Sequence, residues 1–355
     1  MSNLDLNHFR GNSKGPLLSR SIILIVLLSA PLAQGKFIGN IHYGGQEPLD
    51  FSLYWNQVTP ENAGKWASCE QNRDDWSYWG WLDAAYDYAN SRNFTFKEHC
   101  LVWGSQQPSW ICGLSQSEQL AEVEEWIQIL GQRYPGIDLL DVVNEPLHST
   151  PCYKDAIGGD GSNGWDWVVW SVEKAGQYVG GTKILNDYGL LNSSTNSSQI
   201  VQVANICSAQ AIGAEAHGLE RVSAGAISSN LNILDDAGLP LYVSEYDVDE
   251  PRDSQQLAVY QEQFPVFWEY SAIDGITLWG YIQGQIWQRN AYLLRIGGTR
   301  RPVLDWLCNN YLASCSTTTT TTTTTTSGEC LPSGTPCSSD DECCSNKCRG
   351  GKCRG

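Results

Sequence analysis

The stretch DLLDVVNEPLH, from Asp138 to His148, is apolar for most of its length and then stops on Asn144, Glu145 and Pro146. An apolar run of this length that ends at a proline is typical of a buried strand. Two interpretations are open. The polar residues either cap an ordinary strand end, or the strand delivers an acidic side chain to a site. The remainder of the chain has to decide between them.

Seven further strand-like segments occur along the chain, with amphipathic helix patterns such as SEQLAEVEEWIQILGQRY and SQQLAVYQEQFPVFWEY between them. With Ile137–Asn144, the predicted strands are Phe37–Tyr43, Phe51–Thr59, Phe94–Trp103, Lys183–Asp187, Ile212–Gly218, Leu239–Val248 and Gly275–Tyr281. Alternating apolar strands and helices predict an α/β fold, and the length fits a (β/α)8 TIM barrel. An open doubly wound sheet is the alternative, but no glycine-rich phosphate loop follows the first strand.

Composition divides the chain into four predicted parts. Residues 1–35 are typical of a signal peptide, because Lys14 and Arg20 precede a short apolar run that is followed by small residues. Residues 36–315 form the barrel, 316–327 a threonine-rich disordered linker, and 328–355 a cysteine-rich domain. The apolar run is too short to span a bilayer comfortably. We therefore expect a secreted, extracellular protein with no membrane attachment after cleavage.

Charge and cysteine content narrow the class of protein. The formal net charge of -17 argues against nucleic acid or an anionic membrane as partner, because both require a basic surface. A neutral substrate fits better. Thirteen cysteines in an exported chain predict disulfides. In the barrel region we expect the pairs Cys112–Cys152 and Cys308–Cys315, and a free, buried thiol at Cys100.

The tail carries six cysteines between Cys330 and Cys353, with a vicinal pair in the middle, and resembles the inhibitor-cystine-knot framework. Three disulfides would replace a core that so short a segment cannot build. Its end is basic. Two interpretations remain open, an inert plug that protects the C-terminus or a knottin-like module that adheres to acidic wall polysaccharide.

Polar and aromatic side chains gather where the predicted strands end, which is where the site of such a barrel lies. The polar and aromatic residues at these strand ends are Glu61, Asn62, Lys65, His99, Trp103, Gln106, Asn144, Glu145, Glu215, His217, Glu245, Trp279 and Trp287. Glu145 and Glu245 would face each other across the barrel mouth. Paired carboxylates surrounded by aromatic rings and amides are what cleavage of a glycosidic bond requires. A set of unrelated polar caps is the alternative.

Seven motifs carry a resemblance to glycoside hydrolase family 10: VTPENAGKW, HCLVWGSQQPSW, DVVNEP, ILNDYGLLN, IGAEAHGLE, YVSEYDVD and LWGYIQGQIW, in that order. The resemblance covers Lys36 to Ala313. It implies a secreted endo-β-1,4-xylanase that acts on plant-type xylan or xylo-oligosaccharides by a retaining double displacement. It also implies a TIM barrel. We expect a monomer without cofactor or metal.

The resemblance also implies roles for individual residues. Glu145 would be the general acid/base and Glu245 the nucleophile. Glu61, Asn62 and Lys65 would hold the sugar on the non-reducing side of the cut. The subsites nearest the bond would be lined by His99, Trp103, Gln106, Asn144, Tyr188, His217, Trp279 and Trp287. Two rival functions remain. One is the same barrel acting on cellulose or mannan, and the other is a non-catalytic polysaccharide-binding protein, which the presence of both carboxylates disfavours.

Two positions depart from the pattern of the family. Gly104 stands where many relatives have histidine, which predicts a lost hydrogen bond and a wider cleft. Glu215 stands where a glutamine is common. If Glu215 lies beside Glu245, the two carboxyl groups cannot both ionise easily, so one pKa should be raised. Either Glu215 takes the shared proton and the nucleophile stays ionised, or Glu245 shares the proton. We favour the second outcome, with a modest upward displacement of the pKa of Glu245.

Overall fold

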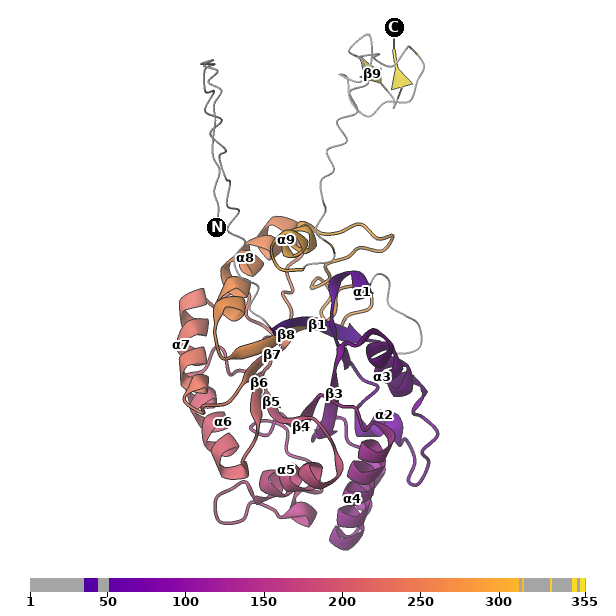
Figure 1. The fold of residues 1–355 in the computed structure, drawn as a ribbon, viewed down its shortest axis with the longest axis vertical. Coiled ribbons are helices and arrows are strands. Elements are labelled where there is room, and N and C mark those ends of the chain that lie inside the picture. The colour runs from indigo at the N-terminus through magenta and orange to yellow at the C-terminus, as the bar shows by residue number, and fades with distance from the viewer. Residues whose placement is uncertain are drawn as a thin grey trace, which may run out of the picture. The chain divides into compact units, whose positions relative to one another are not determined.

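The computed structural model describes residues 35–43, 51–312, 315, 333, 347–349 and 352–354. Within them, eight parallel strands close into a barrel in chain order, with β8 paired to β1 (Figure 1). The strands are β1 (Phe37–His42), β2 (Gln57–Pro60), β3 (Thr95–Val102), β4 (Leu139–Asn144), β5 (Thr182–Asp187), β6 (Ala211–Ala214), β7 (Leu241–Tyr246) and β8 (Ile273–Leu278). The predicted (β/α)8 barrel is confirmed, and the open doubly wound sheet is excluded.

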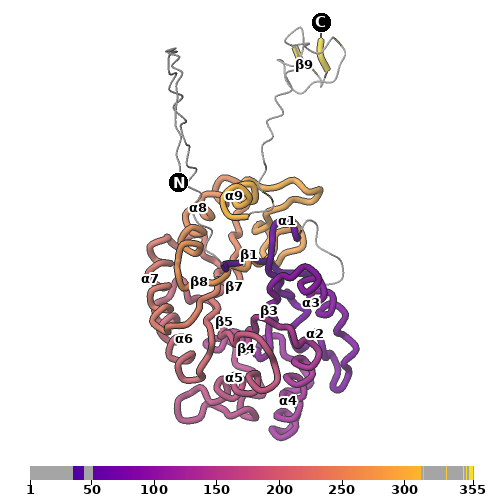
Figure 2. Tube along the Cα trace, in the orientation of Figure 1, coloured from indigo at the N-terminus to yellow at the C-terminus, as the bar shows by residue number. Residues whose placement is uncertain are grey.

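Helices surround this ring of strands (Figure 1, Figure 2). They are α1 (Phe51–Tyr54), α2 (Trp66–Cys69), α3 (Gly80–Arg92), α4 (Gln116–Arg133), α5 (Asp166–Tyr178), α6 (Ser194–Cys207), α7 (Ala224–Asp235), α8 (Asp253–Glu269) and α9 (Pro302–Asn310). Short 3-10 turns cover Ser109–Gly113 and Lys154–Ile157. Helix α4 begins at a capping box in which Ser115 and Glu118 bond each other's backbone, and it buries Val123, Trp126 and Leu130. The covering helices are thus the amphipathic segments of the sequence.

One predicted strand is wrong in its first half. Residues Phe51–Thr59 were expected to be a single strand, but Phe51–Tyr54 form helix α1 and only Gln57–Pro60 form β2. Phe51 and Tyr54 are both buried. Residues three apart share one face of a helix, whereas a strand would place them on opposite faces. The helical turn therefore buries both rings, and a strand would expose one of them.

Apolar side chains fill the amino-terminal end of the barrel. Phe37, Leu139, Ile184, Ala211 and Tyr242 form a buried cluster that is separate from the main core, and five different strands contribute to it. The rings of Phe37 and Tyr242 stack 5.9 Å apart. Closure at this end leaves the opposite, carboxyl ends of the strands as the place for polar side chains.

Two disulfides lie in the barrel region, Cys112–Cys152 and Cys308–Cys315, and both predicted pairs are confirmed. Cys100 is free and buried, as predicted. In the tail, Cys348–Arg349 (β9) and Lys352–Cys353 (β10) pair antiparallel, and Cys353 is disulfide-bonded. The predicted signal peptide up to residue 34, the linker at 316–327 and most of the cysteine-rich domain lie outside the described residues. None of the helices in the described ranges has the length and apolar character needed to cross a membrane.

Candidate active site

Glu145 directly follows β4, and its backbone explains why the strand ends there. Its φ is 51°, in the left-handed region that non-glycine residues rarely adopt, and Pro146 has no N–H to continue the ladder. The Glu145 N–H donates to the carbonyl of Asn186 at 2.7 Å, which fixes this turn. Strain of this kind costs about 1–3 kcal/mol and is typical of functional sites. The indole Nε1 of Trp103 donates to Oε2 of Glu145 at 3.0 Å, so the carboxyl group is held in place.

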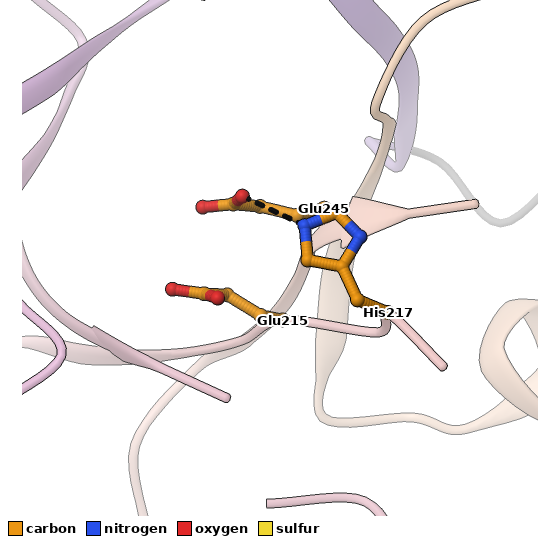
Figure 3. Close-up of side chains that lie close together, drawn as sticks. All are labelled: Glu215, His217 and Glu245. Carbon is orange, nitrogen blue, oxygen red and sulfur yellow. Dashed lines mark hydrogen bonds and ion pairs between the residues drawn. The ribbon is translucent and has the colours of Figure 1, made fainter. Parts of the chain in front are cut away.

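Glu245 lies at the carboxyl end of β7 and is paired with a histidine. Nε2 of His217 lies 3.1 Å from Oε2 of Glu245 (Figure 3). Nδ1 of the same ring lies 2.9 Å from Oδ2 of Asp247. Burial alone would lower the pKa of His217, but its two carboxylate partners raise it to about 10. Burial alone would raise the pKa of Glu245, but the hydrogen bond from His217 and the surrounding positive charge lower it to about 2. Glu245 is therefore a charged carboxylate clamped by an imidazolium.

Glu215 follows β6, and Figure 3 shows its carboxyl group directed to the same side as that of Glu245. Nδ2 of Asn186 lies 2.9 Å from Oε1 of each carboxyl group and 2.7 Å from Oδ1 of Asn144. Burial, and next the charge of Glu245, hold the pKa of Glu215 well above its usual range. The expected upward displacement of the pKa of Glu245 was therefore wrong. Glu215 takes the shared proton because Glu245 has the imidazolium partner, whereas Glu215 is bonded to a neutral amide.

A further histidine, which is fully buried, also supports Glu245. Nδ1 of His99 lies 2.9 Å from Oδ2 of Asp141 and 3.9 Å from Oε1 of Glu245. Lys97 lies 3.0 Å from the same Asp141 oxygen and adds positive charge inside the barrel. The ring of Trp279 lies 5.1 Å from that of His99 and 6.2 Å from that of His217, so it contacts both histidines. These contacts fix the position of His99 relative to Glu245.

The side chains after β2 form a separate polar network. Nζ of Lys65 donates to Oδ1 of Asn62 at 2.9 Å and to Oε1 of Gln106 at 2.7 Å. The same ammonium lies 4.9 Å from the centre of the Trp103 ring. Burial raises the pKa of Glu61, Lys65 counteracts that effect, and Glu245 adds to it. This network therefore lies within electrostatic reach of Glu245 and in direct contact with the tryptophan that binds Glu145.

Two exposed aromatic residues from the predicted set lie at the edges of the site. Trp287 is 55% exposed, donates from Nε1 to Oδ2 of Asp247 at 2.8 Å and lies 4.8 Å from the His217 ring. Tyr188 is 42% exposed and stacks on the His148 ring with centroids 3.9 Å apart. Flat apolar faces that remain open to solvent beside buried carboxylates are suited to stacking on sugar rings.

The sequence-based interpretation missed several members of the site. Asn186, which joins Asn144, Glu215 and Glu245, was not proposed, and neither was Asp247 on the far side of His217. Asp187 was missed as well, although it holds His148 at 2.6 Å. The signal was present, because all three are polar residues at the ends of β5 or β7. Functional side chains of such a barrel lie at the carboxyl ends of its strands, so considering every polar residue at those ends would have found them.

Gly104 has a steric reason in this chain. A Cβ atom at this position would lie 2.5 Å from the carbonyl oxygens of both Ser149 and Thr150. The Gly104 N–H donates to the Ser149 carbonyl at 3.0 Å. The wider cleft expected from a missing side chain is therefore not found at this point, because the chain that follows Glu145 occupies the space.

Glu215, His217 and Glu245 offer potential metal-ligand atoms within 4.8 Å of one another. An imidazole must be neutral to bind a metal. Here both ring nitrogens of His217 face carboxylates, and its pKa is raised to about 10, so the ring carries a proton. The arrangement fits an internal ion pair better than a cation site.

A half-buried carboxyl group after β4, held by an indole, and a buried one at the end of β7, held by an imidazolium, define the site. The model of glycosyl hydrolase family 10 matches residues 33–308. The chain belongs to this family. Its members are glycoside hydrolases, which agrees with a paired-carboxylate site.

Similar sequences carry xylanase names. The chain is 40% identical over 281 residues to endo-1,4-beta-xylanase B of Cellvibrio japonicus, an alignment that covers 78% of this chain and 46% of that protein. It thus spans about half the length of that relative. It is 26% identical over 259 residues to endo-1,4-beta-xylanase 2 of Aureobasidium pullulans, covering 66% of this chain and 71% of that protein.

Solved structures share the barrel. A family 10 structure from Paenibacillus barcinonensis superposes with a TM-score of 0.68 at 20% identity, covering 77% of this chain and 93% of that chain. Xylanase 10B of Thermotoga petrophila in complex with xylobiose superposes with a TM-score of 0.65 at 20% identity, covering 76% and 91%. At this level of identity the likeness concerns the fold.

Proposed function

We propose that the chain is a secreted, retaining endo-β-1,4-xylanase that cleaves internal bonds of plant-type xylan. The observation that carries the proposal is the pairing of Glu145 with Trp103 and of Glu245 with protonated His217 at the carboxyl ends of the barrel strands. The two carboxyl groups of a glycosidase have different roles in the reaction. Their different surroundings determine which group takes which role. The xylanase names of its relatives support xylan as the substrate.

In the first step, the ionised Glu245 attacks the anomeric carbon of the sugar on the non-reducing side. Glu145 donates its proton to the glycosidic oxygen as the bond to the leaving chain breaks, and a glycosyl-enzyme ester forms. The His217 imidazolium keeps Glu245 ionised and orients it. Trp103 fixes the carboxyl group of Glu145 through the indole N–H.

In the second step, Glu145, now a carboxylate, removes a proton from water while the water oxygen attacks the anomeric carbon. The ester bond to Glu245 breaks, and the carboxylate returns to its partner His217. Asn186 lies 2.9 Å from Oε1 of Glu245 and positions that oxygen in both steps. Glu61, Asn62 and Lys65 hold the sugar chain on the non-reducing side of the cut.

The test is release of reducing ends from xylan, carboxymethyl cellulose and mannan, measured side by side with the complete chain. We expect activity on xylan to exceed that on the other two polymers. Glu245→Ala should abolish hydrolysis of each. Glu145→Ala should slow cleavage of xylan by about 10²–10⁴-fold and cleavage of activated aryl xylosides far less, because a good leaving group needs no proton. Preferential action on cellulose or mannan, or none at all, would overturn the proposal.

A further inference from the structure

A second concave region lies outside the catalytic carboxyl groups. It is a cavity of about 460 Å³, formed after β2 and at the start of α3, and its lining includes Asn62, Ser68, Gln71, Tyr78 and Trp81. Its volume is within the range of small-ligand sites. None of the side chains that line it carries a charge. A neutral ligand with hydroxyl groups fits such a lining better than an anion or a cation.

The aromatic lining residues are unusually open to solvent. Trp81 is 66% exposed and Tyr78 is 37% exposed. Of the fifteen tryptophans in the chain, all of which lie in the described residues, Trp81 and Trp287 alone are exposed. Trp287 contacts His217 and so belongs to the catalytic site. Trp81 contributes its indole to a different concave surface, where a stacking ligand would cover it.

The segment that carries these rings is held firmly. Trp76 and Trp79 stack on each other at 5.7 Å, and each also stacks on the buried Trp126, at 6.3 Å and 5.8 Å. Oε1 of Glu70 accepts the Asp74 N–H at 2.8 Å and fixes the preceding turn. Tyr78 and Trp81 therefore project from a segment that is already ordered, so the protein would lose little conformational entropy when a ligand binds.

Asn62 joins this cavity to the catalytic site. Its side chain lines the cavity and also accepts a hydrogen bond from Lys65 at 2.9 Å. Lys65 lies against the Trp103 ring, and Trp103 binds Glu145. A series of contacts thus runs from the acid to Asn62, which shares the cavity with Trp81, so one extended ligand could reach both ends.

We propose that this cavity binds a further xylose unit of the xylan backbone, beyond the sugar held by Glu61, Asn62 and Lys65 on the non-reducing side. Trp81 and Tyr78 stack on the xylose ring, while Ser68 and Gln71 form hydrogen bonds with its hydroxyl groups. This assignment rests on the proposed function, since it takes xylan as the ligand and Glu245 as the point of cleavage.

Binding is measured by calorimetry in the inactive Glu245→Ala background, where the ligand is not consumed. Trp81→Ala should raise the Kd for xylohexaose about five- to tenfold and leave the Kd for xylobiose unchanged. Trp81→Phe keeps a ring and should lose less. Tyr178→Ala removes another exposed ring, at the end of α5, and should change neither Kd.

The position of the cut gives an independent readout. This experiment uses active enzyme, with Glu245 intact, in H2¹⁸O, which labels the new reducing end. The unsubstituted chain should cleave xylopentaose mainly where three or more units lie on the non-reducing side of the cut. Trp81→Ala should lose that preference. An unchanged Kd for xylohexaose, an equal loss for xylobiose, or an effect confined to arabinose-branched ligands would overturn the assignment. Failure of the unsubstituted chain to hydrolyse xylan would instead overturn the proposed function. The two failures can be told apart because the binding measurement does not depend on hydrolysis.

Discussion

Nε2 of His217 lies 3.1 Å from Oε2 of Glu245, and this contact separates the charge states of the site. The His217 imidazolium lowers the pKa of Glu245 to about 2, and it owes its own pKa of about 10 to Glu245 and Asp247. The nucleophile therefore stays ionised in acidic solution. Its reactivity depends on a histidine that carries a proton but transfers none.

His217→Asn should move the acidic limb of the pH–rate profile to higher pH by at least about one pH unit, because an opposite charge in contact lowers a carboxyl pKa by that much or more. The profile of kcat/KM on xylotriose measures this limb. His148→Asn is the matched control, since His148 pairs with Asp187 rather than with Glu245. An acidic limb that is equally placed in both variants would contradict the role of His217.

Glu215→Gln should leave kcat/KM in mildly acidic solution close to that of the unsubstituted chain. A protonated carboxyl group and an amide have similar shape, and the pKa of Glu215 lies well above its ordinary value. Glu245→Gln is the contrasting variant and should be inactive. A large loss of activity in Glu215→Gln would show that Glu215 works as a carboxylate.

The same substitution has a signature in stability. Because the folded-state pKa of Glu215 is raised above 4.5, its contribution to stability is fully present below pH 4.5 and is lost as pH rises towards the folded-state pKa. The gain in Tm of Glu215→Gln over the unsubstituted chain should therefore grow as the pH rises above 4.5. Thermal unfolding at several pH values measures it, and a gain that shrinks with pH would contradict the assignment of the proton.

Trp287→Ala should lower activity on xylan and raise the relative rate on cello-oligosaccharides. Xylose lacks the exocyclic hydroxymethyl group of glucose, and the Trp287 ring, held by Asp247 and packed on His217, would crowd that group. Trp287→Phe keeps a ring but not the hydrogen bond and should change the ratio less. Kinetics on xylotetraose and cellotetraose give the ratio, and an unaltered ratio in Trp287→Ala would contradict this account of specificity.

The strand pattern predicts the barrel well because apolar runs and their polar ends are local features. Because Glu145 and Glu245 are polar residues at the ends of such runs, the same pattern also located them. The place of Asn186 at a strand end is visible in the sequence, but its role in joining Asn144, Glu215 and Glu245 is not. Asn186 pairs opposite Asn144 across β4 and β5, and that alignment depends on the closed sheet. Which of Glu215 and Glu245 carries the proton likewise required the position of His217, which no spacing in the sequence supplies.

Removal of residues after Ser316 should leave kcat/KM on soluble xylo-oligosaccharides unchanged, because all eight barrel strands and the Cys308–Cys315 disulfide remain. An earlier truncation, after Ala313, would also remove Cys315. A fall in activity confined to insoluble, glucuronic-acid-bearing xylan would favour an adhesive tail, and no change on any substrate would favour an inert plug. Loss of activity on soluble substrate would contradict the predicted domain boundary.

The most direct measurement traps the intermediate. A 2-deoxy-2-fluoro xylobioside with a good leaving group should glycosylate the enzyme as the leaving group departs. The glycosyl-enzyme should then hydrolyse slowly, so that peptide mass spectrometry finds one added 2-deoxy-2-fluoroxylobiosyl group. The account predicts that this group is esterified to Glu245, with none on Glu215, and that Glu215→Gln is labelled at the same position. Labelling of Glu215, or complete turnover of xylan by an enzyme in which Glu245 is never labelled, would contradict it.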